Sequence, residues 1–138
     1  MFYKNTGKEI LIRLDDGEEI IQTLKGICKN EGVQSALITG IGAARKVEIG
    51  HWNTETKKYD NKKFEGLLEI VSLNGNVTIN EEPMIHLHIS IGMEDFSTKS
   101  GHLISAEIYP TCEIVLLPIS TKITREKDEK TGLNLQQF

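Results

Sequence analysis

Three of the four histidines lie in two neighbouring segments that alternate apolar and polar residues. His86 and His88 are separated only by Leu87, and His102 opens the next apolar stretch. Successive side chains of a β-strand point to opposite faces, so both imidazoles of the pair would lie on one face. An antiparallel connection would bring His102 beside them, roughly 5 Å away across the ladder. Neutral imidazoles bind zinc and other late first-row divalent metals, so the spacing favours a metal site.

The spacing of the histidines also fits a second interpretation. His86 and His88 would then be polar residues on the solvent face of an amphipathic strand, and His102 an unrelated turn residue. A site with three protein ligands keeps an open position for water or substrate, which is the form of a catalytic zinc site. A reaction would also need a nearby acid or base and a shaped pocket. The pattern therefore predicts metal binding and leaves catalysis open.

One helix and several strands are expected around these residues. The apolar run Ile10–Leu14 predicts a first strand that ends at a turn. From Glu18 to Glu31 the apolar residues recur every three or four positions, which predicts a helix. Asp15 or Asp16 would cap its start, and Gly32 would end it. No other segment has a clear helical period.

The segments after residue 33 are short, apolar and rich in β-branched residues. Strands are expected at residues 36–39, 47–52, 67–73, 76–79, 84–91, 101–109 and 112–117. Gly40 and Gly42 indicate a bend or bulge within a long strand. The dipeptide Asn74-Gly75 predicts a hairpin turn between two of the strands. The connections are too short for helical crossovers, so we expect a mostly antiparallel sheet.

The composition is that of one folded domain spanning residues 1–138, with a charged tail, 124–138, that we expect to be mobile. The chain is 38% hydrophobic and 26% charged. No apolar run reaches the ~18 residues of a membrane span, and the first residues lack a signal-peptide pattern. We therefore expect a cytoplasmic protein that does not bind membranes. Cys28 and Cys112 form no recognisable motif, and we interpret both as reduced core residues.

Three pieces of the sequence resemble the plants-and-prokaryotes-conserved (PPC) domain, whose members are often labelled as DNA-binding proteins. They are Glu69–Gly75, His86–His88 and Gly101–Leu103, in the family's order and at its separations, and Leu37–Ala44 is similar to its Ile-Gly segment. The resemblance covers nearly the whole chain. It implies an α+β fold with a large curved, mostly antiparallel sheet and one main helix, assembled as a homotrimer.

The same resemblance implies that His86, His88 and His102 are ligands of a divalent metal, which we expect to be zinc. At fold level the three-histidine arrangement is similar to that of acetolactate decarboxylases. That similarity directs attention to an acid and a cation near the metal, where they could contact the metal's other ligands or a substrate. The candidates in this chain are Glu69, Arg45 and Glu107.

One residue departs from the family pattern, because Ser100 stands where a glycine is common. If that position requires a positive φ, Ser100 would be strained. His102 itself is retained, so the departure concerns the geometry of the turn rather than the expected ligand.

Three functional hypotheses follow. The first is a metal-binding homotrimer that binds or converts a small molecule. The second is a DNA-associated regulatory protein, although the net charge of −4 disfavours phosphate backbones. The plant members bind DNA through a separate AT-hook, a basic Arg-Gly-Arg-Pro arm, which this chain lacks. The third is a structural assembly module whose histidines line a subunit contact.

Overall fold

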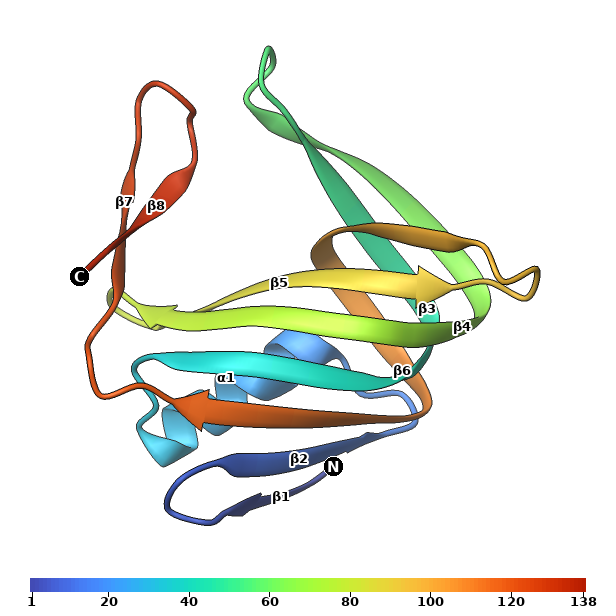
Figure 1. Ribbon diagram of the computed structural model, residues 1–138, viewed down its shortest axis with the longest axis horizontal. Helices are drawn as coiled ribbons and strands as arrows, with labels where there is room; N and C mark the ends of the chain where they lie inside the picture. The colour runs from blue at the N-terminus through green and yellow to red at the C-terminus, as the bar shows by residue number, and fades with distance from the viewer.

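A computed structural model describes residues 1–138, which form eight β-strands and one α-helix (Figure 1). The elements, in chain order, are β1 (Phe2–Asn5), β2 (Ile10–Asp15), α1 (Ile20–Glu31), β3 (Ala36–Asn53), β4 (Lys58–Ile79), β5 (Pro83–Gly92), β6 (Thr98–Pro118), β7 (Thr124–Lys127) and β8 (Asn134–Gln137). All strand pairings are antiparallel. The expected α+β architecture is confirmed.

Long, bent strands close part of the sheet upon itself. The six-stranded sheet has the order β1-β2-β6-β3-β4-β5, and β5 also pairs with β6. The pairings β6–β3, β3–β4, β4–β5 and β5–β6 therefore form a complete circuit. Register shifts within β3, including one between Gly40 and Gly42, mark the bulges that let the strands curve. The bulge predicted at these glycines is present.

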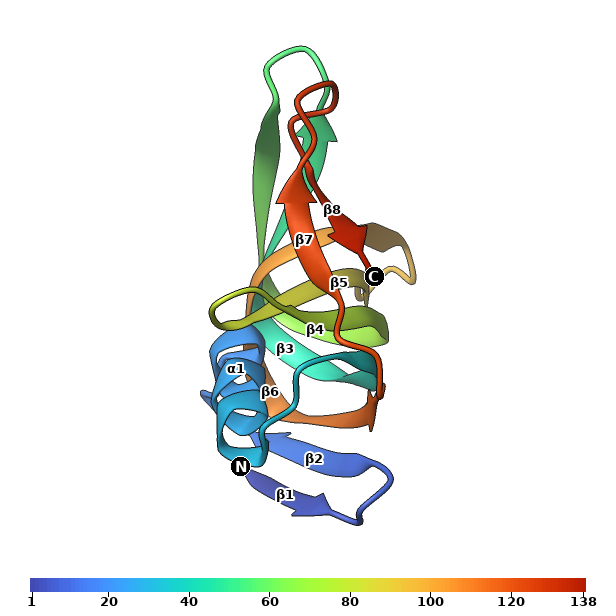
Figure 2. The same cartoon turned by 90° about the vertical axis from the view of Figure 1, so that its left-hand side faces the viewer.

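Helix α1 covers one side of the sheet, as Figure 2 shows. Its buried residues Ile20, Leu24, Ile27 and Cys28 recur at helical spacing. The helix contacts β5 and β6 and closes the main core. Cys112 is buried as well, and both thiols are free. No helix is both long enough and apolar enough to span a membrane.

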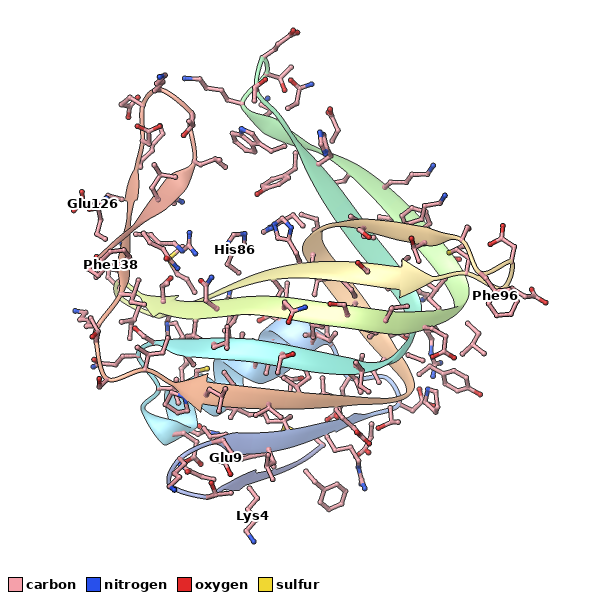
Figure 3. All side chains as sticks on the ribbon, viewed as in Figure 1. Lys4, Glu9, His86, Phe96, Glu126 and Phe138 are labelled. Carbon is pink, nitrogen blue, oxygen red and sulfur yellow. The ribbon has the colours of Figure 1, made fainter.

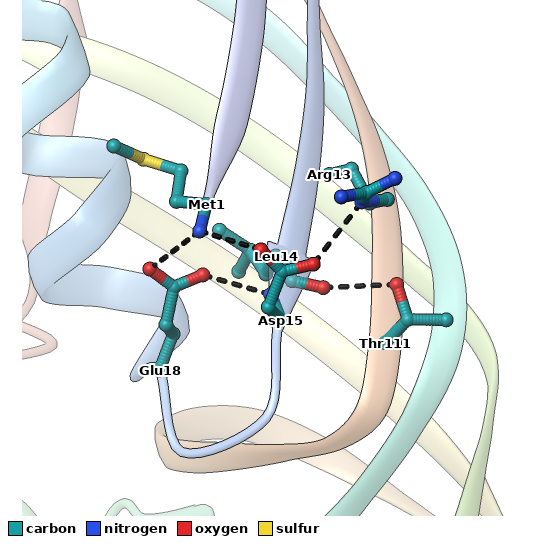
Figure 4. A network of polar contacts seen from close by, with 6 residues as sticks. All are labelled: Met1, Arg13, Leu14, Asp15, Glu18 and Thr111. Carbon is teal, nitrogen blue, oxygen red and sulfur yellow. Dashed lines mark hydrogen bonds and ion pairs between the residues drawn. The ribbon is translucent and has the colours of Figure 1, made fainter.

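The residue that caps the start of α1 differs from the sequence prediction. Glu19, rather than Asp15 or Asp16, is the N-cap, and its side chain accepts a hydrogen bond from the Gln22 amide. Asp15 is used elsewhere, because it ends β2 and binds the ammonium group of Met1 at 2.7 Å (Figure 4). Glu18 accepts a hydrogen bond from the Asp15 amide and also contacts that ammonium group. The predicted end is correct, because Gly32 has a φ of 66°.

The hairpin predicted at Asn74-Gly75 is wrong. Both residues lie within β4, which continues unbroken to Ile79. Gly75 pairs with Leu87, and a Cβ added there would collide with the backbone carbonyl of His86. Glycine is therefore required here for the close approach of two strands rather than for a turn.

Two hairpins extend beyond the main sheet toward the same side (Figure 1). One is the end of β3 with the start of β4, where Trp52 pairs with Tyr59. The other is the β7–β8 hairpin, formed by the segment that the sequence indicated as a charged tail. Lys57 joins the two hairpins by donating from its Nζ atom to the Glu129 carbonyl at 2.7 Å.

Candidate metal centre

Strand pairing brings the three histidines together. His88 lies directly opposite His102 across the β5–β6 ladder, and His86 is two residues back along β5. Leu87 and Ile89, which alternate with the histidines, are buried in the core. The imidazoles therefore lie on the opposite face, and Figure 3 shows His86 pointing into the space between the two hairpins.

The three rings form a compact cluster. Their centroids are separated by 5.3 Å for His86 and His88, 5.1 Å for His86 and His102, and 5.6 Å for His88 and His102. One nitrogen from each ring can be chosen so that all three lie within 4.8 Å of one another. This separation allows the three nitrogens to converge on one ion.

The cluster lines a cavity of about 630 Å³. The walls come from the β3–β4 hairpin, from β5 and β6, and from the β7–β8 hairpin. The lining residues are Gly50, His51, Trp52, Tyr59, Met84, Ile85, His86, His88, Gly101, His102, Arg125, Gly132, Leu133, Asn134 and Leu135. The lining contains no aspartate or glutamate.

Burial keeps two of the imidazoles neutral at ordinary pH. The pKa of His86 is lowered from 6.5 to about 4, first by burial and then by the charges of Arg125, His102 and His88. The pKa of His102 is also lowered, again with burial as the main cause, followed by the charges of His88 and Arg125. Neutral imidazole is the form that binds metals.

The Nδ1 atoms of the half-buried His102 and His86 differ in their hydrogen-bond partners. Nδ1 of His102 is buried and has no hydrogen-bond partner. Nδ1 of His86 lies 3.2 Å from Nη2 of Arg125. A buried ring nitrogen without a partner is costly, and a metal ligand bond would remove that cost. The residues present therefore fit a metal ion bound by three imidazoles.

An aromatic pair supports His102. The Tyr59 ring stacks on the His102 ring, with centroids 4.5 Å apart and an interplanar angle of 14°. Trp52 packs edge-on against Tyr59 at 5.0 Å. These contacts restrict the His102 ring, so the β3–β4 hairpin helps to fix the geometry of the cluster.

The other three candidate residues lie away from the cluster. Arg45 forms ion pairs with Asp16 and Glu107, and its guanidinium lies over the Tyr109 ring at 4.6 Å. Glu69 is exposed and pairs with Gly92 at the opposite end of β5 from His86. None of the three lines the cavity. Within one chain, therefore, the structure does not place Glu69, Arg45 or Glu107 beside the three histidines.

Sequence reasoning missed Arg125, Trp52 and Tyr59. Arg125 lay in the segment interpreted as a mobile tail. The usable signal was the short Thr124–Lys127 run, which is separated by a polar, glycine-containing turn from Asn134–Gln137. Ser100, whose conformation was in question, is extended and lies within hydrogen-bond distance of Ser90, with 2.8 Å between the two Oγ atoms. The departure from the family pattern is accommodated without a positive φ.

The fold and the cluster define a small α+β domain with three histidines on a curved sheet. Residues 1–120 match the family of the Plants and Prokaryotes Conserved domain. The chain belongs to this family, whose domain is also abbreviated PPC. The match ends before the β7–β8 hairpin. No curated protein matches the chain.

Solved structures with a similar fold support the family assignment. A candidate DNA-binding protein from Bacteroides thetaiotaomicron is 36% identical with a TM-score of 0.94, covering 99% of this chain and 96% of that one. A protein from Archaeoglobus fulgidus described as metal-containing is 35% identical with a TM-score of 0.89, covering 100% and 99%. Acetolactate decarboxylase from Bacillus subtilis is 15% identical with a TM-score of 0.60, covering 86% and 54%. The similarity to acetolactate decarboxylase confirms the expected relationship in fold and shows nothing about activity.

Proposed function

We propose that His86, His88 and His102 bind one divalent metal ion, zinc or a close substitute, and that the adjoining cavity binds a small molecule. The observation that carries the proposal is the convergence of three ring nitrogens within 4.8 Å on the floor of a cavity. The metal-containing relative from Archaeoglobus fulgidus supports it. So do the lowered pKa values of His86 and His102, which keep these ligands unprotonated.

A zinc ion with three imidazole ligands keeps an open position at which it can polarise the oxygen of a bound molecule. The lining of one chain supplies no carboxylate to move a proton. Binding is therefore the role that the geometry supports best. Chemical conversion of the bound molecule would be a further step at the same site.

Elemental analysis of protein purified without a polyhistidine tag tests the metal site. After zinc addition and desalting, the wild type should hold about one equivalent per chain. The His88→Ala variant should lose the metal and keep its fold, because His88 is exposed on the cavity floor. His51→Ala is the matched control, since His51 lines the same cavity outside the cluster. Wild-type content below about a tenth of an equivalent would leave only the structural-module hypothesis for the histidines.

Self-assembly as a homotrimer is part of the proposal. Apolar side chains on the sheet face opposite the core are unusually exposed, among them Leu11, Leu37, Ile41 and Leu117 at 40–59%. Leu37 pairs directly with Leu117, so their side chains are neighbours on that face. An apolar area of this kind is typical of a subunit interface.

DNA binding is the second candidate function, because the relative from Bacteroides thetaiotaomicron is described as a candidate DNA-binding protein. The net charge of −4 opposes it. Electrostatic binding to duplex DNA is strongest at low salt, so a gel-shift measurement at low ionic strength is the most permissive test. We expect no shift there, and a shift that salt abolishes would favour the DNA hypothesis.

A further inference from the structure

Arg125 reaches into the cavity without a negatively charged partner. Its Nε atom donates to Thr78 at 3.1 Å, Nη1 to the Asn134 carbonyl at 2.9 Å, and Nη2 to Asn76 at 2.8 Å. All of these partners are neutral, and Arg125 forms no ion pair. A half-buried guanidinium without an anion is costly.

The backbone of Arg125 is also held in place. Its amide donates to Oδ1 of Asn80 at 2.9 Å, and its carbonyl accepts from Nδ2 of the same side chain at 2.8 Å. The Asn80 side chain thus binds both backbone polar groups of Arg125. The cation is therefore positioned by the fold rather than by chance rotation of a surface side chain.

The cavity has an excess of positive groups and donors. Its lining contains Arg125 and no carboxylate, and a divalent ion on three neutral imidazoles would add two more positive charges. The indole N–H of Trp52, another lining residue, is buried without an acceptor. Electrostatics alone therefore favour an anionic occupant.

Metal binding must also change the bonds that Arg125 makes. A neutral imidazole has one N–H group and one nitrogen lone pair, and arginine can only donate. Nδ1 of His86 therefore accepts from Nη2 of Arg125 and uses the ring's only free lone pair. If the metal takes that lone pair at Nδ1, it replaces Arg125. If the metal instead binds Nε2, the ring proton must sit on Nδ1. Nδ1 is then a donor and faces Nη2 of Arg125, which is also a donor.

In either case the His86–Arg125 hydrogen bond cannot coexist with a metal on His86. Of the five N–H groups of a guanidinium, three would stay bound to Thr78, Asn134 and Asn76. One N–H on Nη1 and one on Nη2 would then be free. A carboxylate can bridge these two nitrogens.

We propose that Arg125, freed from His86 when the metal binds, recognises the carboxylate of a small organic anion in this cavity. The inference rests on the proposed metal site and names the class of molecule that this site takes. Apolar walls favour an organic carboxylate over inorganic phosphate, because Trp52, Met84, Ile85, Leu133 and Leu135 line the same cavity.

Calorimetric titration of the zinc-loaded protein with benzoate tests this inference. Benzyl alcohol, of similar shape but uncharged, and inorganic phosphate are the comparison probes. The Arg125→Gln variant should weaken benzoate binding about tenfold or more, because a charge-assisted pair is lost. Lys127→Gln should have no effect, since Lys127 lies on the same strand but pairs with Glu129 outside the cavity. Arg125→Lys should fall between wild type and Arg125→Gln, because it keeps the charge and loses the planar fork.

Zinc content is measured on every sample before any anion is added. Full zinc content in the wild type and Arg125→Gln, with weaker benzoate binding only in the variant, supports the inference. Equal benzoate affinity in the two proteins, no benzoate binding, or binding of phosphate alone would overturn it while leaving the metal site intact. A wild type that takes up no zinc would overturn the metal site itself, and the carboxylate assignment with it.

Discussion

His86 and His102 are held as neutral imidazoles by burial and by neighbouring positive groups. Both effects lower their pKa values, that of His86 to about 4. In the metal-free protein these two imidazoles are therefore ready to bind a cation without first losing protons. The cost appears in acid, where these two imidazoles resist protonation in the folded protein but take up protons in the unfolded chain.

The stability of the metal-free protein should consequently fall in weak acid. The unfolded His86 takes a proton near the ordinary imidazole pKa of 6.5, and the folded one only near 4. The stabilising contribution of the neutral, buried ring is thus complete above pH 6.5 and is lost as the pH falls toward 4. Urea unfolding across this range should show a shallower pH dependence for His86→Gln than for the wild type. Identical slopes would contradict the burial of this imidazole.

The strands can bring the histidines together because glycines let them approach closely. Gly75 faces the backbone of His86, and Gly101 precedes His102. A Cβ at Gly101 would lie 2.5 Å from Cγ2 of Ile49 and 2.9 Å from the carbonyl oxygen of Gly50. The contacts with the carbonyl groups of His86 and Gly50 involve backbone atoms, which cannot move without displacing a strand.

Gly75→Ala should therefore destabilise the fold by about 1–3 kcal/mol, as overpacking does elsewhere. Gly26→Ala is the matched control, because Gly26 lies within α1 and a Cβ there would meet nothing within 4 Å. Alanine in a helix should stabilise by roughly 0.5–1 kcal/mol relative to glycine. Urea unfolding of the two variants would measure opposite shifts, and a neutral Gly75→Ala would refute the role given to this glycine.

Local patterns predicted the elements better than their boundaries. The alternation around His86 and His88 correctly indicated a strand with both histidines on one face. The helix was predicted from its apolar period, but its cap was misassigned because Asp15 is held by the N-terminus. Asn74-Gly75 was misread because a glycine needed for strand contact looks the same in sequence as one needed for a turn. Arg125 was missed because its role depends on tertiary contacts with Asn76, Thr78 and Asn80.

At the scale of the whole molecule, two hairpins extend from one side of the sheet and enclose the cavity, and α1 covers the core. The remaining sheet face carries exposed apolar residues. The candidate metal site and the surface proposed for self-assembly therefore lie in different parts of the molecule. Changes to one should therefore leave the other intact.

Ile41→Glu should disrupt the proposed homotrimer, because a buried, unpaired carboxylate at a subunit interface is costly. Light scattering on the wild type should give three times the chain mass, and the variant should give a lower mass with its zinc content unchanged. Phe96→Glu is the control, since Phe96 is 95% exposed on the β5–β6 turn. A monomeric wild type would contradict the assembly.

X-ray diffraction from zinc-loaded crystals, measured on both sides of the zinc absorption edge, tests the central claim most directly. We predict one anomalous peak per chain, about 2.0–2.1 Å from a ring nitrogen of each of His86, His88 and His102. We also predict that Arg125 has left His86. The absence of a peak among the three imidazoles, or a peak bound by other residues, would contradict the three-histidine metal site.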